Sequence, residues 1–167
     1  MALRESDLYA CYQRLERPLF NVLYRMLWNR QDSQDLMHDA FVRIWQRRNK
    51  VDADRLEGLV WTAALNLARN RLRWRKRWRT ELLDAEWPDG LPGPEAAAER
   101  QVQQRRLHAV LARLPAGMRE VVLLGEFSGL SQADIAAVLR IPPGTVASRR
   151  HHALRRLREL LTEEDHD

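Results

Sequence analysis

One segment divides the chain into two parts: residues 80–99, which read TELLDAEWPDGLPGPEAAAE. It holds three of the seven prolines and two of the seven glycines of the 167-residue sequence, and it has no basic residue. Proline lacks a backbone donor and clashes with the preceding helical turn, so this composition interrupts a helix. We therefore predict two small domains, at 1–79 and 105–161, joined by a flexible acidic linker at 80–104 and followed by an acidic tail at 162–167.

Outside the linker, apolar residues recur at helical spacing. In residues 34–46, QDLMHDAFVRIWQ, they form one stripe, and either Asp32 or Ser33 can cap the start of this helix. A second helix is predicted from Leu56 to Trp78. Its apolar stripe consists of Leu56, Leu59, Val60, Ala63, Ala64 and Leu67. No segment shows the alternation of a strand, so the predicted fold class is all-α, with two small helical domains.

Basic residues are concentrated in the two predicted domains. Residues 1–79 contain 17 Lys and Arg against nine Asp and Glu, and residues 105–161 contain ten against four. Residues 80–104 reverse this balance, with one basic residue against six acidic ones. We expect two surfaces for a polyanion, joined by a segment that the polyanion repels.

The densest basic cluster is RNRLRWRKRWR, at 69–79, where seven of eleven residues are cationic. No acidic residue lies between Gly58 and Thr80 to neutralise it. Side chains spaced by three and four residues share one helical face that can follow phosphates. These are Asn66, Arg69, Asn70, Arg73, Lys76 and Arg77. The alternative is a generic solvated face, and Trp74 and Trp78 either stack on unpaired bases or close the core of the domain.

Residues 131–161 predict a helix-turn-helix. Ser131 and Asp134 resemble a capping box at the start of a short helix, and residues 141–144, IPPG, interrupt it. Thr145 can cap a longer second helix. The apolar side of that helix is predicted to be Val146, Ala153 or Leu154, Leu157 and Leu161. Its outward side, which enters the major groove in this motif, is Ser148, Arg149, His152, Arg155 and Arg156. The alternative is a helical hairpin with a solvated basic face.

The sequence has no arrangement that points to catalysis. It contains no phosphate-binding glycine loop, no HExxH or CxxC spacing and no paired carboxylates with a plausible pocket, so we predict no enzyme, no cofactor and no metal site. His151 and His152 point about 100° apart on a helix and cannot easily share an ion. The single cysteine, Cys11, is interpreted as a core residue, with redox sensing as the alternative. No run of ~20 apolar residues and no secretory signal is present, so we expect a cytoplasmic protein without membrane insertion.

Two sets of motifs, in this order, resemble one family. DSQDLMHDAFVRIWQ and LVWTAALNLARNRLRWRKR are similar to region 2 of bacterial sigma factors, and residues 111–161 resemble region 4. With only these two regions, the chain resembles an extracytoplasmic-function (ECF) sigma factor, a dissociable initiation subunit of RNA polymerase. The resemblance implies that the protein binds core polymerase, directs it to specific promoters and promotes strand opening. It also implies a cognate anti-sigma factor, often membrane-anchored, that inhibits it.

The resemblance assigns roles to positions. Docking on a coiled coil of the largest polymerase subunit would use Asp35, Leu36, Asp39, Phe41, Arg43 and Gln46. The alternative is that Leu36, Phe41 and Trp45 are only core residues. The face from Asn66 to Arg77 would open the minus-ten element and hold its non-template strand. The loop at 49–54 would hold a flipped base.

Recognition of the minus-thirty-five element would use Thr145, Ser148, Arg149, His151, His152 and Arg155, with the polymerase flap as a further partner. Ala147 stands where the family usually has a basic residue, which puts the sequence preference in doubt. A different class remains as the alternative: an autonomous helix-turn-helix repressor or activator that acts without core polymerase. Such a protein should bind a two-fold operator by itself.

Overall fold

The computed structural model describes residues 2–78 and 94–166, and the predicted linker between 80 and 93 lies outside these residues. The α-helices of the described part are α1 (Glu5–Leu27), α2 (Arg30–Gln46), α3 (Leu56–Arg77), α4 (Pro94–Ala112), α5 (Ala116–Phe127), α6 (Gln132–Leu139) and α7 (Pro143–Asp165). Two 3-10 turns, Arg48–Lys50 and Ala53–Arg55, connect α2 to α3. The described ranges contain no strand, which confirms the predicted all-α class.

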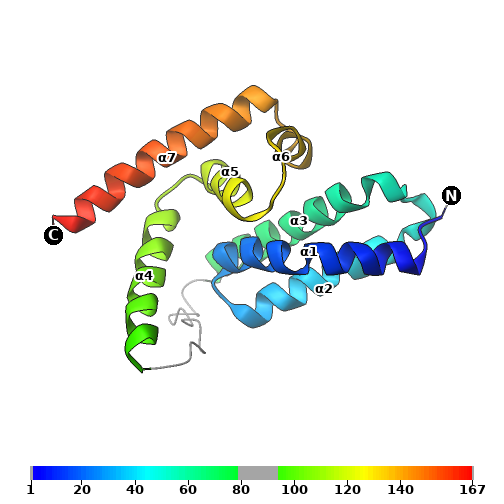
Figure 1. The fold of residues 1–167 in the computed structure, drawn as a ribbon, viewed down its shortest axis with the longest axis horizontal. Helices are drawn as coiled ribbons and strands as arrows, with labels where there is room; N and C mark the ends of the chain where they lie inside the picture. Colours follow the sequence, from blue (N-terminus) through cyan, green and yellow to red (C-terminus); the bar gives the residue numbers. More distant parts are fainter. Residues whose placement is uncertain (1, 79–93, 167) are drawn as a thin grey trace.

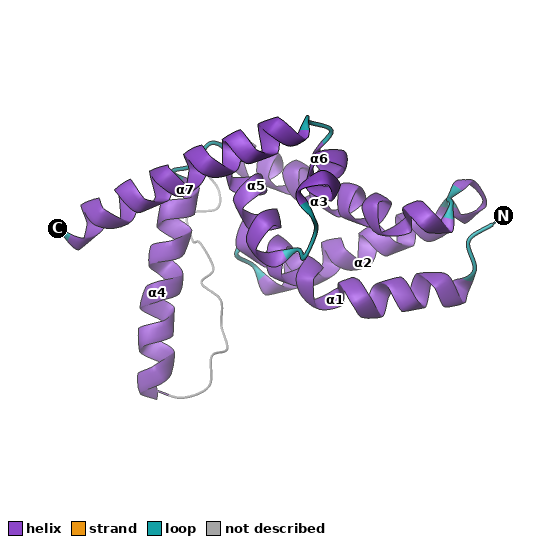
Figure 2. Ribbon diagram, turned by 45° about the horizontal axis from the view of Figure 1, so that its top comes forward, coloured by secondary structure: helices purple, strands orange, loops and turns teal. Residues whose placement is uncertain are grey.

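Helices α1, α2 and α3 form one bundle, seen at the right of Figure 1. Helices α5, α6 and α7 form a second unit, with α7 packed across α5 and α6. Helix α4 extends away from the bundle and touches α7 near its own C-terminal end (Figure 2). None of the described helices is both long and apolar enough to cross a membrane.

The core of the α1–α3 bundle consists of fully buried side chains. Leu19 and Val22 face inward from α1, and Trp61 is fully buried on α3. Phe41 of α2 meets the ring of Tyr12 edge-on, with ring centroids 5.1 Å apart. Aromatic rings of this kind bury large areas, so three helices suffice to close the bundle.

Cys11 also lies in this core, with no exposed surface. Burial raises the pKa of its thiol to about 11, so the reactive thiolate is scarce at neutral pH. The interpretation of Cys11 as a core residue is confirmed, and the redox alternative loses its physical basis.

Helix α2 begins earlier than the sequence suggested. Asn29, in extended conformation, accepts a hydrogen bond from the Asp32 backbone at 2.8 Å and is the cap. Ser33 is buried inside the helix, where its hydroxyl donates to the Asn29 carbonyl at 2.7 Å. The predicted caps Asp32 and Ser33 are therefore wrong, because Asn29 provides the same acceptor one turn earlier.

Helix α3 matches its prediction in extent but not in the side that is buried. Its buried residues are Leu56, Val60, Trp61, Ala64, Leu65 and Ala68. Leu59, which the apolar stripe included, is 37% exposed. Helix α3 packs against both α1 and α2, and its buried side includes Trp61 and Leu65, which lie outside the predicted stripe.

The second unit contains the predicted helix-turn-helix. Ser131 accepts from the Asp134 backbone at 3.1 Å, so the predicted cap of α6 is confirmed. Helix α6 ends at Leu139, and the next residue, Arg140, has a φ of +56°. Helix α7 then starts at Pro143, where a missing N–H costs nothing and φ is already helical. Thr145 lies within the first turn, so its predicted role as cap is wrong.

The buried side of α7 consists of Val146, Ala153 and Leu160, spaced by seven residues. Leu161, predicted for this side, is 37% exposed, because it follows the buried Leu160 and points about 100° away from it on the helix. The neighbouring Leu157 packs only partly against the core.

Helix α4 begins at Pro94, within the segment predicted as linker, so residues 94–104 are helical. Its Arg106 binds the last turn of α7, with nitrogen–oxygen distances of 3.1 Å to Glu164 and 2.6 Å to Asp165. Arg113 lies 3.6 Å from Glu163 in the same turn. These ion pairs thus draw the described part of the predicted acidic tail against α4.

The two units are in contact. Helix α5 packs against α1 and α6 against α3, and both views show this arrangement (Figures 1 and 2). One continuous group of buried apolar residues runs through both, from Leu27 of α1 to Leu124 of α5. How the units are placed relative to each other could not be predicted from the sequence.

Candidate nucleic-acid interface

The face predicted to hold a single strand lies along α3. Asn66, Asn70, Arg73, Lys76 and Arg77 are exposed there, and Arg69 is partly buried. The side chains form an internal series, since Arg69 donates to the amide oxygen of Asn66 at 3.1 Å and Arg73 donates to that of Asn70. The structure therefore brings all six predicted residues to one side of one helix.

Arg69 differs from the other cations of this face because Glu120 of α5 binds it. Its Nε and Nη2 lie 2.6 and 2.8 Å from the two carboxylate oxygens. The hydrogen bonds that Arg69 donates to Glu120 raise the pKa of Arg69, so the guanidinium stays charged. No pattern in the sequence pairs these two residues, which are 51 positions apart.

Arg75 belongs to the same basic run but points the other way. It donates to the carbonyl of Leu27 and to the carboxylate of Asp32, at the junction of α1 and α2. This side chain closes the bundle and is not available to a ligand. A helical projection places Arg75 opposite Arg73, but only the packing shows what it binds.

Trp74 and Trp78 are 48% and 42% exposed, at the end of α3. The guanidinium carbon of Arg71 lies 5.8 Å from the centre of the Trp74 ring. Of the two roles left open by the sequence, closing the core is contradicted by this exposure. The rings are available for stacking.

A cavity of about 150 Å³ lies between α2 and α3. Arg43, Arg47, Asn66 and Asn70 supply its polar lining, with Ile44, Ala63 and Leu67 as apolar walls. It joins Arg43, predicted to dock polymerase, with two residues predicted to hold DNA. The loop at 49–54, predicted to hold a flipped base, consists mainly of 3-10 turns around the buried Val51.

The predicted docking residues on α2 separate into two groups. Asp35, Asp39, Arg43 and Gln46 are exposed. Leu36 and Phe41 are 5% and 6% exposed and belong to the core of the bundle. Among the described residues, neither Asp35 nor Asp39 forms an ion pair, and the carboxylate of Asp35 accepts a hydrogen bond from the Gln31 amide at 2.9 Å. The negative charge of both side chains therefore lacks a cationic partner within the described ranges.

The predicted duplex-reading face lies on the first half of α7. Ser148, His151, His152 and Arg155 are exposed, and Thr145 is partly buried. Arg149 lies back against α5, where its Nη1 would be 3.2 Å from a Cβ built on Gly117. A side chain at Gly117 would therefore require the Arg149 guanidinium to shift by a few tenths of an ångström.

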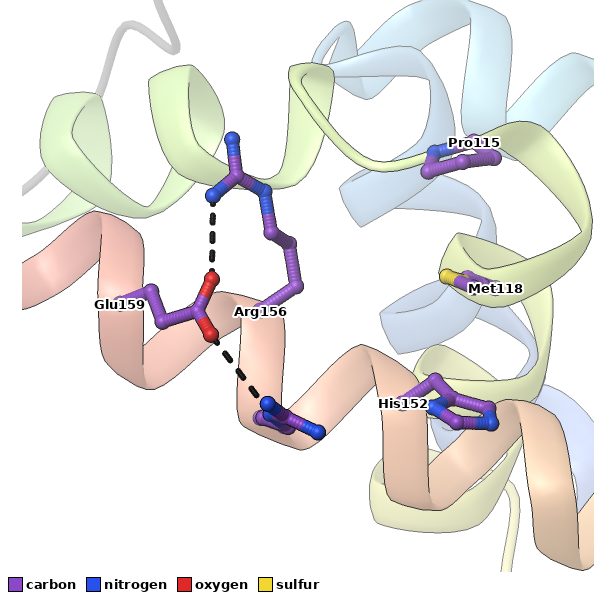
Figure 3. Close-up of a pocket in the computed structure, with 6 residues that line it drawn as sticks. Pro115, Met118, His152, Arg156 and Glu159 are labelled. Carbon is purple, nitrogen blue, oxygen red and sulfur yellow. Dashed lines mark hydrogen bonds and ion pairs between the residues drawn. The ribbon is translucent and has the colours of Figure 1, made fainter.

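Next to this face is a second cavity, of about 330 Å³, between the start of α5 and α7. In Figure 3, the rings of Pro115 and His152 and the side chain of Met118 line it, and Glu159 binds Arg156 at 3.1 Å. The cavity is open and mostly apolar, and it lies beside the predicted DNA-binding residues His152 and Arg155.

Comparison with known proteins follows the same division. Residues 11–80 match the family model for Sigma-70 region 2, and residues 104–157 match that for Sigma-70 region 4. We refer to α1–α3 as region 2 and to α4–α7 as region 4 from here on. The region 2 match ends at the end of the cationic run, and the region 4 match includes the helix-turn-helix.

Curated proteins with similar sequences are also sigma factors. The ECF RNA polymerase sigma factor SigE of Mycolicibacterium smegmatis is 31% identical over 147 residues, which is 86% of this chain. The chain spans 57% of that relative's length. The ECF RNA polymerase sigma factor RpoE of Cereibacter sphaeroides is 32% identical over 130 residues, covering 76% of this chain and 71% of the relative.

Two solved structures share the fold. CnrH, in complex with the cytosolic domain of CnrY, has a TM-score of 0.75 at 24% identity and covers 96% of this chain, with 90% of CnrH matched. The sigma factor RpoE of Bartonella quintana, in complex with the anti-sigma factor NepR, has a TM-score of 0.69 at 23% identity, with coverage of 95% and 96%. These relatives favour the sigma factor over the autonomous repressor, and the chain belongs to the sigma-70 family as an ECF-type RNA polymerase sigma factor.

Proposed function

We propose that this chain is a promoter-specificity subunit that binds core polymerase, reads an upstream duplex with α7 and holds an opened strand on α3. One observation carries the proposal: two separate helical regions each present an exposed face of hydrogen-bonding side chains that includes arginine, with amides on α3 and a hydroxyl and imidazoles on α7, in the order typical of the family. The role is not catalytic, since RNA synthesis belongs to the polymerase.

The strand-holding step rests on the α3 face. Arg73, Lys76 and Arg77 are exposed at helical spacing and can contact successive phosphates. Trp74 and Trp78 can stack on bases, which is worth roughly 1–3 kcal/mol for each base. Because flipping a base costs a few kcal/mol, stacking and phosphate contacts together can offset it.

The cavity between α2 and α3 is the place where we expect a flipped base to bind. Asn66 and Asn70 line it, and each amide offers both a donor and an acceptor for a base edge. Its walls, Ala63 and Leu67, can contact the flat face of the ring. This site replaces the loop at 49–54 in our proposal.

Docking on core polymerase is assigned to the exposed side of α2. Asp35 and Asp39 lie one turn apart and can pair with basic residues of the largest subunit. Leu36 and Phe41 support this surface from inside the bundle. Substitutions of Asp35 and Asp39 should therefore weaken docking without unfolding the protein.

Upstream recognition is assigned to the exposed face of α7. Ser148 and His152 lie nearest to base edges in a helix-turn-helix, and Arg155 lies where a phosphate is expected. An anti-sigma factor is a further proposed partner, supported by the likeness to RpoE, which was solved with NepR. We expect these events to take place in the cytoplasm, where the polymerase is found.

Transcription in vitro with purified core polymerase on genomic fragments tests the proposal. We expect transcripts from a defined set of start sites that core polymerase alone does not use. A protein that shifts a two-fold operator without polymerase, and has no affinity for core, would contradict the proposal and favour the repressor.

A further inference from the structure

The contact between the regions includes one member of the strand-holding face. Glu120 binds Arg69 with both carboxylate oxygens, and its side chain is only 12% exposed. A bidentate carboxylate on a guanidinium has the geometry that a phosphate would adopt. Glu120 therefore occupies the site on Arg69 that a DNA strand needs.

This pair is distinctive within the described ranges. All other ion pairs there join residues of the same region, and only Arg69–Glu120 joins region 2 to region 4. Ring contacts also join the two regions, with the Arg25 guanidinium carbon 3.9 Å from the Phe127 ring centre. The rings of Trp28 and His108 are 4.8 Å apart on the same surface.

The two DNA-binding faces are affected unequally by this contact. Region 4 covers part of α3 through α6, and α7 lies on the other side of α6 from the bundle (Figure 1). Ser148, His151 and His152 of α7 are exposed. In this arrangement the duplex-reading face is open and the strand-holding face is partly blocked.

We propose that Glu120 is a latch, whose ion pair with Arg69 holds region 4 on region 2 in the free protein and prevents α3 from holding single-stranded DNA. Strand phosphates compete with Glu120 for Arg69 and bind only the opened form, so they shift the population toward it. The identity of the ligand that displaces Glu120 rests on the proposed function, but the latch itself is a property of the free chain.

A distance measurement tests the latch without polymerase or promoter. Gln34→Cys in α2 and Ala147→Cys in α7 introduce exposed sites for a donor and an acceptor dye, and the buried Cys11 stays unlabelled. Glu120→Gln keeps the shape of the side chain and removes its charge. We expect lower energy transfer in this variant, with unchanged helix content by circular dichroism.

Glu126→Gln is the matched control. It removes the same charge from the same helix, but Glu126 pairs with Arg150 within region 4, at 3.0 Å. Energy transfer should stay at the level of the unsubstituted protein. If Glu120→Gln leaves the transfer efficiency unchanged as well, the latch is refuted.

Binding of a short, mixed-sequence, single-stranded oligonucleotide gives a second readout. The fluorescence anisotropy of a dye on the oligonucleotide is measured as protein variants without dyes are added. Glu120→Gln should bind at least about fivefold more tightly than Glu126→Gln, with a salt slope steeper by about 0.7, the value for one more phosphate contact. Equal affinities would overturn the latch. Failure in transcription would count instead against the proposed function, which neither measurement requires.

Discussion

Helices α3 and α7 carry the two predicted DNA-binding faces, and they hold their arginines in different ways. On α7 the partners lie within region 4 itself: Arg150 pairs with Glu126, and Arg155 and Arg156 pair with Glu159. On α3, Arg69 pairs with Glu120 of the other region. Region 4 thus organises its own face, whereas the face of region 2 depends on where region 4 lies.

The comparison also separates the arginines of a single basic run. Arg69 binds the neighbouring region, Arg75 closes the bundle, and Arg73 and Arg77 remain available to a ligand. Similar residue types with similar spacing therefore serve three purposes. Only packing distinguishes them, because each purpose is decided by a partner distant in sequence.

The largest effect is expected for the triple substitution of Arg69, Arg73 and Arg77 by alanine. Loss of three guanidinium–phosphate contacts should reduce promoter opening by about two orders of magnitude or more, because hydrogen bonds to charged groups are worth ~1.5–3 kcal/mol each. Reactivity of unpaired thymines measures opening, and core binding should remain measurable. Unchanged opening would remove α3 from the strand-holding role.

Arg75→Ala should act on stability instead. It leaves the Leu27 carbonyl and the Asp32 carboxylate without their donor in a partly buried site, where the two ion-pair partners are 28% and 24% exposed. We expect the free energy of unfolding to fall by about 2 kcal/mol in chemical denaturation. Arg77→Ala, at an exposed position, should change it little. Similar losses in both variants would contradict the division within the run.

On α7, combined replacement of Ser148, Arg149 and His152 by alanine should weaken recognition of the upstream element about tenfold, since a base contact is worth ~1–3 kcal/mol. Competition between promoter fragments that differ only upstream measures this. Arg158→Ala, on a later exposed turn, controls for loss of charge. Selectivity that survives the triple replacement would argue against insertion of α7 into the groove.

The smallest effect concerns pH and the contact between the regions. Burial, and secondarily the charge of Arg119, lower the pKa of His108 in the folded protein. The unfolded chain therefore binds a proton more readily than the folded one, so stability is lost as pH falls through the ordinary range of histidine toward the lowered pKa. His108→Phe keeps a ring against Trp28 and should flatten the pH dependence between about 5 and 7. Denaturation at several pH values tests this, and identical slopes would exclude His108.

The sequence predicted the helical class and the main elements well. Apolar spacing indicated α2 and α3, and Ser131 correctly placed the start of α6. The starts of α2 and α7 were predicted less well. Asn29, and not Asp32 or Ser33, caps α2, and α7 begins at Pro143, before the predicted cap Thr145. Such choices depend on how the chain enters the helix, which is decided by packing of the preceding segment.

The helix faces that form the candidate site could be predicted from the sequence, but the contacts that their side chains make could not. Exposure of Trp74 and Trp78, and burial of Leu36, follow from how α3 and α2 turn within the bundle. The Arg69–Glu120 pair joins positions that no periodic pattern connects. Long-range contacts of this kind are decided by three-dimensional packing, so spacing alone does not reveal them.

The packing of α5 on α1 joins two parts of one polypeptide, and this makes closure a unimolecular equilibrium. Dilution therefore does not change the fraction of molecules that are open. Any ligand that needs the opened form binds with its intrinsic affinity reduced by the fraction of molecules that are open. If one molecule in about a hundred is open, the apparent dissociation constant is about a hundredfold larger than that of region 2 on its own.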